Sequence, residues 1–427
     1  MAVTSIPAGH PTARKLYSVA LFAAFLRRPS FANSLTGAAP KQGDAESKLK
    51  GQSSPDMPFV RATDLSKTAG DTVSVDLYHM LQAMPIMGGA MAEGRGTPLS
   101  SASMDISINQ FRFPVSAGDT MSQQRTVHSL RGIAMANTYD LVRRYIDQLS
   151  LVHVAGGRGS QNTVDWVIPV QFSSGTTAHP DFASITINTV KAPTYNRHYV
   201  VNGTGLTQGG AQLASIATTD DMQLEHIDAI ATLIADSAFQ LQPVQVADDP
   251  AAKDEPMYVL YLTERQWNTI QTNTSGQVWR TFLQNAWNRA SYGSKHPLFK
   301  GEPGMWRNIL VRKTSRAIRF LASENARTNP STNVETNTTV ASGLSTTHAA
   351  DRALLMGAQA LIQAYGRAQN SDFYFGWSEK ELDHGDKLEV LAKGMCGFSK
   401  TRFDYPTTSG VEATDHGVYV IDSAVPL

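Results

Sequence analysis

The alternation of apolar and polar positions predicts a two-stranded β-hairpin in the first quarter of the chain. Residues 72–80 and residues 103–109 both alternate with a period of two, which is typical of strands with one covered face. A stretch rich in Met, Gly and Pro joins them at about residues 82–100. The apolar positions are Val73, Val75 and Leu77 on the first strand and Met104, Ile106 and Ile108 on the second.

Beyond the hairpin the apolar positions move by one residue, to Phe111, Phe113 and Val115. Such a slip predicts a bulge or twist at the root of the hairpin. An isolated hairpin has one ladder and no core, so it is only marginally stable in water. We therefore expect the hairpin to project and to find its apolar cover on a neighbouring copy of the chain.

The segment that follows predicts one long amphipathic helix over residues 119–154. Its apolar stripe recurs at steps of three and four residues, and no breaker occurs before Gly156. At a rise of about 1.5 Å per residue, this helix would be roughly 50 Å long. The stripe consists of Val127, Leu130, Ala134, Thr138, Leu141, Tyr145, Leu149 and Val152.

The remaining segments mix helical and strand patterns. We expect a short amphipathic helix over residues 16–26, with Leu16, Val19, Phe22, Ala23 and Leu26 on one side, inside an otherwise flexible N-terminal stretch. Residues 156–212 predict an irregular β-rich insertion, with strands at 164–172, 184–190 and 198–201. Residues 326–346, rich in Thr, Asn and Ser, predict a surface loop.

Further helices are expected at 265–273, 278–289 and 349–365, and another, capped by residues 219–221, carries Leu224, Ile227, Ile230 and Ile234. Strands are expected at 258–262, 309–312, 317–321, 388–403 and 418–422. This order favours an α+β architecture over a doubly wound sheet.

Charge and cysteine content narrow the class of protein. Among 427 residues, Lys and Arg total 37 and Asp and Glu also total 37, so the formal net charge is zero. This balance argues against a surface that coats nucleic acid and suits a protein that packs against its own copies. The single cysteine, Cys396, excludes an intrachain disulfide, favours cytosolic folding and is expected in the core. No apolar run is long enough for a membrane span.

Candidate chemistry is sparse. The densest acidic cluster would allow a divalent cation and a metal-dependent hydrolase, but a solvated edge is the favoured interpretation; it comprises Glu379, Glu381, Asp383, His384, Asp386 and Glu389. No spacing typical of a metal, nucleotide or nucleophile site occurs. We therefore predict no catalytic, metal-binding or cofactor-binding residues, no cofactor and no enzymatic activity. Adjacent Trp and Arg residues, as at Trp306, fit a nucleic-acid groove or a subunit interface, and the zero net charge favours the interface.

Three segments together resemble a known family. They are residues 58–75 (PFVRATDLSKTAGDTVSV) with 121–125 (MSQQR), residues 296–311 (HPLFKGEPGMWRNILV), and residues 383–403 (DHGDKLEVLAKGMCGFSKTRF) with 417–425 (GVYVIDSAV). In this order they resemble the major capsid proteins of tailed bacteriophages, in the group related to that of phage N-four. The resemblance covers roughly residues 12–427.

The resemblance implies the Hong Kong 97 (Johnson) capsid fold, which is α+β. Residues 1–58 would form the N-terminal arm and residues 73–116 the extended hairpin loop that lies on an adjacent subunit. Residues 59–72 and 117–221 would form the peripheral domain, with residues 119–154 as its spine helix. Residues 222–395 would form the axial domain, and residues 396–427 would return to the peripheral domain.

The implied function is a major capsid protein whose pentamers and hexamers close an icosahedral head, in the virion, around packaged DNA. Assembly would occur in the host cytoplasm, with no membrane partner. The expected partners are copies of itself, portal and scaffolding proteins, a decoration protein, and DNA through non-specific contact. An encapsulin-like nanocompartment shell is the alternative. The expected assembly residues are Val73, Val75, Leu77, Met84, Met87, Met104, Ile106, Ile108, Arg125 and Trp306.

Overall fold

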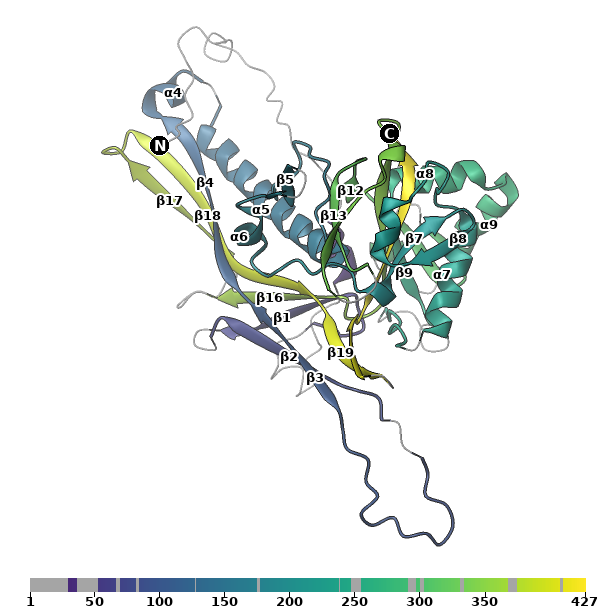
Figure 1. The fold of residues 1–427 in the computed structure, drawn as a ribbon. Coiled ribbons are helices and arrows are strands. Elements are labelled where there is room, and N and C mark those ends of the chain that lie inside the picture. The colour runs from purple at the N-terminus through teal and green to yellow at the C-terminus, as the bar shows by residue number, and fades with distance from the viewer. Residues whose placement is uncertain are drawn as a thin grey trace.

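The computed structural model describes residues 30–36, 53–66, 70–81, 84–126, 128–174, 177–237, 239–246, 255–290, 297–299, 303–330, 334–367, 375–407 and 410–427. The helix expected at residues 16–26 lies outside this part of the chain. Two β-sheets organise the described residues, and a hairpin extends away from both (Figure 1).

One sheet has five strands and is covered by a long helix. Its order is β1, β16, β18 and β17, and β4 pairs with the other edge of β18. Helix α5 (Leu130–Ala155) packs on β4 and β18, where the Phe113 and Tyr145 rings meet edge to face at 5.5 Å. The strands are β1 (Phe59–Ser66), β4 (Asn109–Asp119), β16 (Leu361–Arg367), β17 (Phe375–Leu382) and β18 (Lys387–Lys400).

The second sheet has eight strands, in the order β10, β11, β9, β15, β21, β7 and β8, with β12 beside β15. Helices α7 (Leu224–Asp236), α8 (Glu264–Asn273) and α9 (Gly276–Ala290) bury apolar side chains in a cluster with this sheet. The strands are β7 (His198–Asn202), β8 (Gly205–Gln208), β9 (Tyr258–Thr263), β10 (Gly304–Trp306), β11 (Ile309–Thr314), β12 (Arg319–Phe320), β15 (His348–Met356) and β21 (Val418–Pro426).

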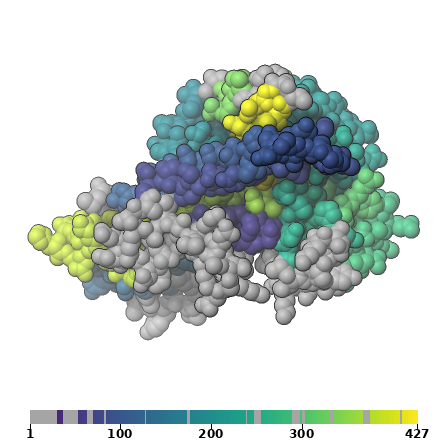
Figure 2. Space-filling model, turned by 90° about the horizontal axis from the view of Figure 1, so that it is seen from below, coloured from purple at the N-terminus to yellow at the C-terminus, as the bar shows by residue number. Residues whose placement is uncertain are grey.

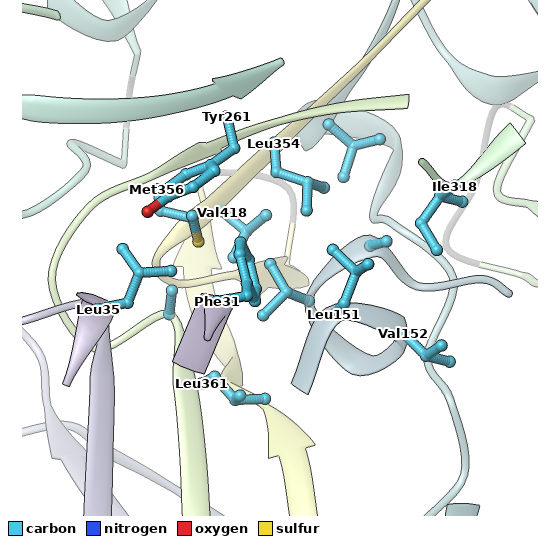
Figure 3. Close-up of a cluster of buried hydrophobic side chains, with 14 of the residues drawn as sticks. Phe31, Leu35, Leu151, Val152, Tyr261, Ile318, Leu354, Met356, Leu361 and Val418 are labelled. Carbon is cyan, nitrogen blue, oxygen red and sulfur yellow. The ribbon is translucent and has the colours of Figure 1, made fainter. Parts of the chain in front are cut away.

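The largest apolar cluster joins the two sheets. Phe31 of the short helix α2 (Phe31–Leu35) packs edge to face on Tyr261 of β9 at 5.0 Å. Leu151 of α5 and Leu361 of β16 belong to the same cluster (Figure 3). The chain crosses between the sheets three times, between β4 and β7, from β15 to β16 and between β18 and β21, so neither sheet is built from one continuous segment.

The predicted long helix is interrupted. Helix α4 (Thr120–Gln124) ends at Arg125, and α5 begins after Ser129, whose side chain accepts a hydrogen bond from the Gly132 N–H. The prediction of one helix over residues 119–154 is therefore wrong at residues 125, 126, 128 and 129, and Val127 of the predicted stripe lies outside the described residues. The end of the helix is confirmed, because Gly156 adopts the left-handed conformation with φ of 66° and closes α5. At 26 residues, α5 is about 39 Å long.

The predicted helix at residues 349–365 is wrong. This segment forms β15 and β16, one strand in each sheet, separated by a turn at residues 357–360. A Cβ at Gly357 would lie 2.3 Å from the carbonyl oxygen of Gln242, so the turn requires glycine. Apart from half-buried His348, the described side chains of both strands are buried, and pairing on both sides outweighs the helical propensity of their Ala and Leu residues.

The polar insertions hold more structure than expected. The loop predicted at residues 326–346 contains the hairpin of β13 (Asn325–Thr328) and β14 (Thr336–Thr339). In the 156–212 region only the strand at 198–201 is confirmed, because residues 164–171 are irregular and residues 184–186 are helical. The other elements are β5 (Phe172–Ser174), β6 (Thr177–Ala178), α6 (Phe182–Thr186), β19 (Arg402–Thr407), β20 (Gly410–Asp415) and single 3-10 turns at Tyr195–Arg197, Gly210–Ala214, Pro297–Phe299 and Ser342–Leu344.

Several local predictions are confirmed. Helices α7, α8 and α9 and strands β9, β11, β18 and β21 lie where the patterns indicated. The capping residue of α7 differs, because Gln223 and His226 form a reciprocal capping box in place of residues 219–221. Cys396 is fully buried, as expected for a core residue.

The strands are grouped differently from the domain boundaries expected from the sequence. Strands β7 and β8, expected in the peripheral domain, belong to the eight-stranded sheet, and so does β21 at the C-terminus. Strands β16 and β17, expected in the axial domain, belong to the five-stranded sheet. The cause is the repeated crossing of the chain between sheets, which no local pattern reports.

Candidate assembly surfaces

The hairpin is an antiparallel pair of β2 (Thr72–Tyr78) and β3 (Ser101–Ser107). Val73 pairs with Ile106, and Val75 pairs with Met104, so the predicted apolar faces coincide. The His79 N–H donates to the Ser100 carbonyl at 2.9 Å and extends the ladder by one bond. The predicted slip lies at Asn109, where the chain leaves β3 and enters the five-stranded sheet as β4.

The root of the hairpin is covered by its own chain. Met104 and Ile106 are buried, and the apolar face packs in one cluster with Ile362, Ala364 and Phe403. Val73, Val75, Leu77 and Ile108 are half-buried against the same cluster. The expectation that a neighbour must supply this cover is therefore wrong for the root. A role in assembly for these six residues stays a prediction.

The side chain of Asn188 ties the root to the body. Its Nδ2 donates to the Ser107 carbonyl at 2.8 Å and to the Phe398 carbonyl at 3.1 Å. Its Oδ1 accepts from the Ser107 N–H at 3.0 Å. One amide thus bridges the backbones of β3 and β18, an arrangement that no sequence pattern announces.

The tip of the hairpin contrasts with the root. Among the described residues 84–100, no helix or strand is present, and the apolar side chains lie in solvent. Met84 is 93% exposed and Met87 is 77% exposed. Seen from below, the hairpin forms a continuous band across the front of the molecule (Figure 2). A large exposed apolar patch marks an interaction surface, and the flexible methionine side chain adapts well to one.

Two further predicted assembly residues have partners within the chain. Arg125 is half-buried at the end of α4. Hydrogen bonds from Ser122 are the main cause that lowers the pKa of Asp119, and the charge of Arg125 lowers it further. The Trp306 indole N–H donates to the Asp228 carboxylate at 2.9 Å, and Arg307 pairs with the same carboxylate at 2.8 Å. Trp306 also packs against the cluster beneath α7–α9.

The acidic cluster lies at the exposed turn between β17 and β18. Glu379 pairs with Arg131 of α5 at 2.6 Å, and Asp383 pairs with Lys387 at 2.7 Å. The hydrogen bond from Lys387 lowers the pKa of Asp383. Within the described part of the chain, no group of three or more His, Cys, Asp or Glu side chains is arranged to hold a metal ion.

Buried ion pairs within the eight-stranded sheet also contact the end of the spine helix through a hydrogen bond. Arg352 of β15 binds Asp422 of β21 through two bonds of 2.8 Å and donates to the carbonyl of Ala155, at the end of α5, at 2.9 Å. His198 lies 2.6 Å from the same carboxylate. Burial alone would raise the pKa of Asp422, but the charges of Arg352 and His198 outweigh it and hold the pKa below its usual value.

A second buried group of charges joins β18 to the hairpin of β19 and β20. Asp415 is held by Lys400 at 2.7 Å and by Arg402 at 2.8 Å. Burial lowers the pKa of Lys400 to about 8. Charges buried in pairs fix the relative position of the elements that carry them, because separating a pair would leave an unpaired charge in the interior.

The helices of the described residues are not long and apolar enough to cross a bilayer.

A projecting loop with an exposed apolar tip and a spine helix on a five-stranded sheet fit a self-assembling structural protein. Residues 5–427 match the family model described as phage capsid protein. The chain belongs to this phage capsid protein family. It is a structural, non-enzymatic major capsid protein that forms the icosahedral head shell and is a component of the virion. Because the chain belongs to the phage capsid protein family, the phage head is retained and the nanocompartment shell is not.

Solved phage capsids share the fold over the whole chain. The capsid of Ralstonia phage GP4 is 25% identical, with a TM-score of 0.71 over 99% of this chain and 98% of that chain. The cyanophage Pam1 capsid is 16% identical, with a TM-score of 0.62 over 100% and 99%. The head of the Helicobacter pylori bacteriophage KHP40 is 13% identical, with a TM-score of 0.58 over 99% of both chains. No curated protein matches the chain significantly.

These matches confirm the α+β capsid fold of the Hong Kong 97 type and the self-association that a capsid requires.

Proposed function

We propose that this capsid protein assembles as pentamers and hexamers that enclose packaged DNA, and that the hairpin tip of each subunit lies on an adjacent subunit. The observation that carries the proposal is the contrast between a buried root and an exposed tip. Ile106 at the root is fully buried, whereas Met84 at the tip is 93% exposed. A tip held rigidly at its base and apolar at its end is suited to reach a neighbour.

The same proposal assigns the two sheets to the two domains of the fold. The five-stranded sheet with α4 and α5 would be the peripheral domain, and the eight-stranded sheet with α7–α9 would be the axial domain around the five-fold and six-fold axes. The grouping of strands into sheets supports this division. Residues 1–58 would be the N-terminal arm.

The proposed partners beyond the shell are a portal protein, a scaffolding protein and a decoration protein, with assembly in the host cytoplasm. Packaged DNA would be contacted non-specifically, which is consistent with a formal net charge of zero. Placement in the group related to the phage N-four capsid protein belongs to this proposal and rests on the motif order described above.

The test removes the tip and keeps the root. Replacing residues 81–99 by a two-residue Asn-Gly turn preserves the ladder up to the bond between His79 and Ser100. We expect a soluble subunit with an unchanged melting temperature that forms no closed shells in the electron microscope. Val164→Ser is the matched control, because Val164 is 97% exposed in the irregular stretch of residues 164–171, outside the hairpin, and this variant should assemble. Normal shells from the tipless variant would refute the proposal.

A further inference from the structure

Helix α5 carries a second apolar stripe that the core covers only in part, since Val142 and Ile146 pack against the main apolar cluster whereas Tyr139 is exposed. Its residues recur at steps of four, three and four, which places them on one face of the helix. They line one wall of a groove of about 600 Å³, together with residues of β17 and β18 on the opposite wall. The stripe consists of Met135, Tyr139, Val142 and Ile146, and the opposite wall of Phe375, Trp377, Val390 and Ala392.

The walls of this groove are unusually exposed for aromatic side chains. Tyr139 is 77% exposed, Trp377 is 54% exposed and Phe375 is 42% exposed. Three such rings facing one groove form a contiguous apolar surface, which a water-soluble protein keeps covered. We therefore expect an apolar segment, long enough to follow α5, to cover the groove.

The described chain begins at one end of this groove. Ser30 lines it, and the Ser30 hydroxyl donates to Asp147 of α5 at 2.7 Å. The Ala32 N–H donates to the same carboxylate oxygen at 3.3 Å, so the start of α2 is fixed against α5. From Asp147 the groove runs back along α5 to Met135, a distance of about 18 Å at a rise of about 1.5 Å per residue.

We propose that residues 14–28 of the same chain lie in this groove as a helix alongside α5. The stretch LYSVALFAAFL at residues 16–26 supplies the apolar occupant. As a helix it would be about 16 Å long, close to the length of the groove. Pro29 ends the helix before Ser30, because the residue preceding a proline is disfavoured in the helical conformation.

The hydrogen bond between Ser30 and Asp147 determines which residues of the segment lie beside which residues of α5. With Ser30 beside Asp147 and both helices rising equally per residue, Phe22 lies beside Tyr139 and Val19 beside the turn that carries Met135. Both residues belong to the apolar side predicted for this segment. The short tether from Ser30 keeps the local concentration of the segment high, whereas a second copy would have to bind without that advantage. Placement of this segment in the groove does not require shell formation.

The test is a disulfide between the segment and the groove. In the full-length double variant Ala23→Cys/Tyr139→Cys, mild oxidation should join the two positions within one chain. The natural Cys396 is buried and does not compete. The expected result is a protein that migrates as a monomer without reductant and yields the peptide pair linking positions 23 and 139 by mass spectrometry. The matched control is Ala23→Cys/Trp287→Cys, because Trp287 is 76% exposed on α9 and should form no link.

A mixture of the two single variants, Ala23→Cys and Tyr139→Cys, shows whether the segment in the groove comes from the same chain or from a second copy. Monomers after oxidation support the proposal, whereas disulfide-linked dimers show that a second copy fills the groove and overturn it. A link between Tyr139→Cys and Met87→Cys in mixed samples would assign the groove to a neighbour's hairpin tip instead.

Carbene footprinting gives an independent readout on the protein without cysteine substitutions. Removing residues 2–28 should increase labelling of Tyr139 and Trp377 several-fold and leave Trp287 unchanged. Equal labelling of Tyr139 and Trp377 with and without these residues would also overturn the proposal.

Discussion

Asn188 and Ser107 are joined by a reciprocal pair of hydrogen bonds, with the Asn188 amide donating to the Ser107 carbonyl at 2.8 Å and accepting from its N–H at 3.0 Å. The side chain thus acts as a short strand beside β3, at the point where the hairpin leaves the five-stranded sheet. A third bond, to the carbonyl of Phe398, connects the same amide to β18. The direction in which the hairpin projects is fixed here.

Asn188→Ala should therefore loosen the hairpin root. Loss of these bonds is expected to cost about 1–3 kcal/mol in the free energy of unfolding, measured by chemical denaturation. Amide hydrogen exchange should quicken at Ser107. The exposed neighbour offers a control, since Thr189→Ala should change the free energy of unfolding by less than about 0.5 kcal/mol. Equal stabilities of the two variants would show that the bridge is unimportant.

We expect the loss of stability on truncating a leucine of α5 to depend on how deeply that side chain is buried. Leu149 is fully buried, so Leu149→Ala should lower the free energy of unfolding by about 2–5 kcal/mol. Leu141 belongs to the same predicted stripe but is only half-buried, and Leu141→Ala should cost clearly less. Thermal melting of both variants checks this order, and a larger loss for Leu141→Ala would contradict the burial described here.

The ion pair of Arg352 and Asp422 predicts strong non-additivity. Arg352→Met leaves a buried carboxylate without its main partner and should destabilise the protein by roughly 3–5 kcal/mol. Asp422→Asn should also destabilise it, because Arg352 then lacks its counter-charge. The double variant should lose less than the sum of the two single losses, as measured in a double-mutant cycle by denaturant unfolding. Simple additivity would mean that the two groups act independently.

Two buried histidines predict loss of stability in acid. Burial lowers the pKa of His153 to about 4 and that of His416 to about 4. Between about pH 6.5 and pH 4 the unfolded chain binds protons that the folded chain excludes, so stability falls as the pH falls. Each group contributes roughly 1 kcal/mol per pH unit across this window, and the effect levels off below about pH 4.

Equilibrium unfolding at several pH values between 7 and 4 measures this slope. His153→Gln retains a donor for the Thr186 carbonyl, 3.2 Å away, and should make the slope shallower by the contribution of one histidine. His384→Gln, at the exposed turn between β17 and β18, controls for the loss of a histidine as such. An unchanged slope in His153→Gln would exclude that group as a source of acid sensitivity.

The sequence by itself determined the elements whose pattern is local. Alternation in β2 and β3 predicted the hairpin and its apolar face, which carries Val75 and Met104, and helical spacing predicted α7. Gly156 marked the end of the spine helix, because a left-handed residue at that position favours glycine. The order of short motifs identified the capsid family. Each of these signals depends on residues close together in the chain.

The tertiary structure alone decided which strands share a sheet and which apolar faces are covered. Residues 349–365 carry a helical composition, yet they form β15 and β16 because partners distant in sequence pair with both. The hairpin root is covered by Ile362 and Phe403, more than 250 positions away, and the tip is not. Periodicity reports that a residue prefers burial, but only the assembled chain determines what buries it, because sheet pairing and apolar packing are contacts between distant segments.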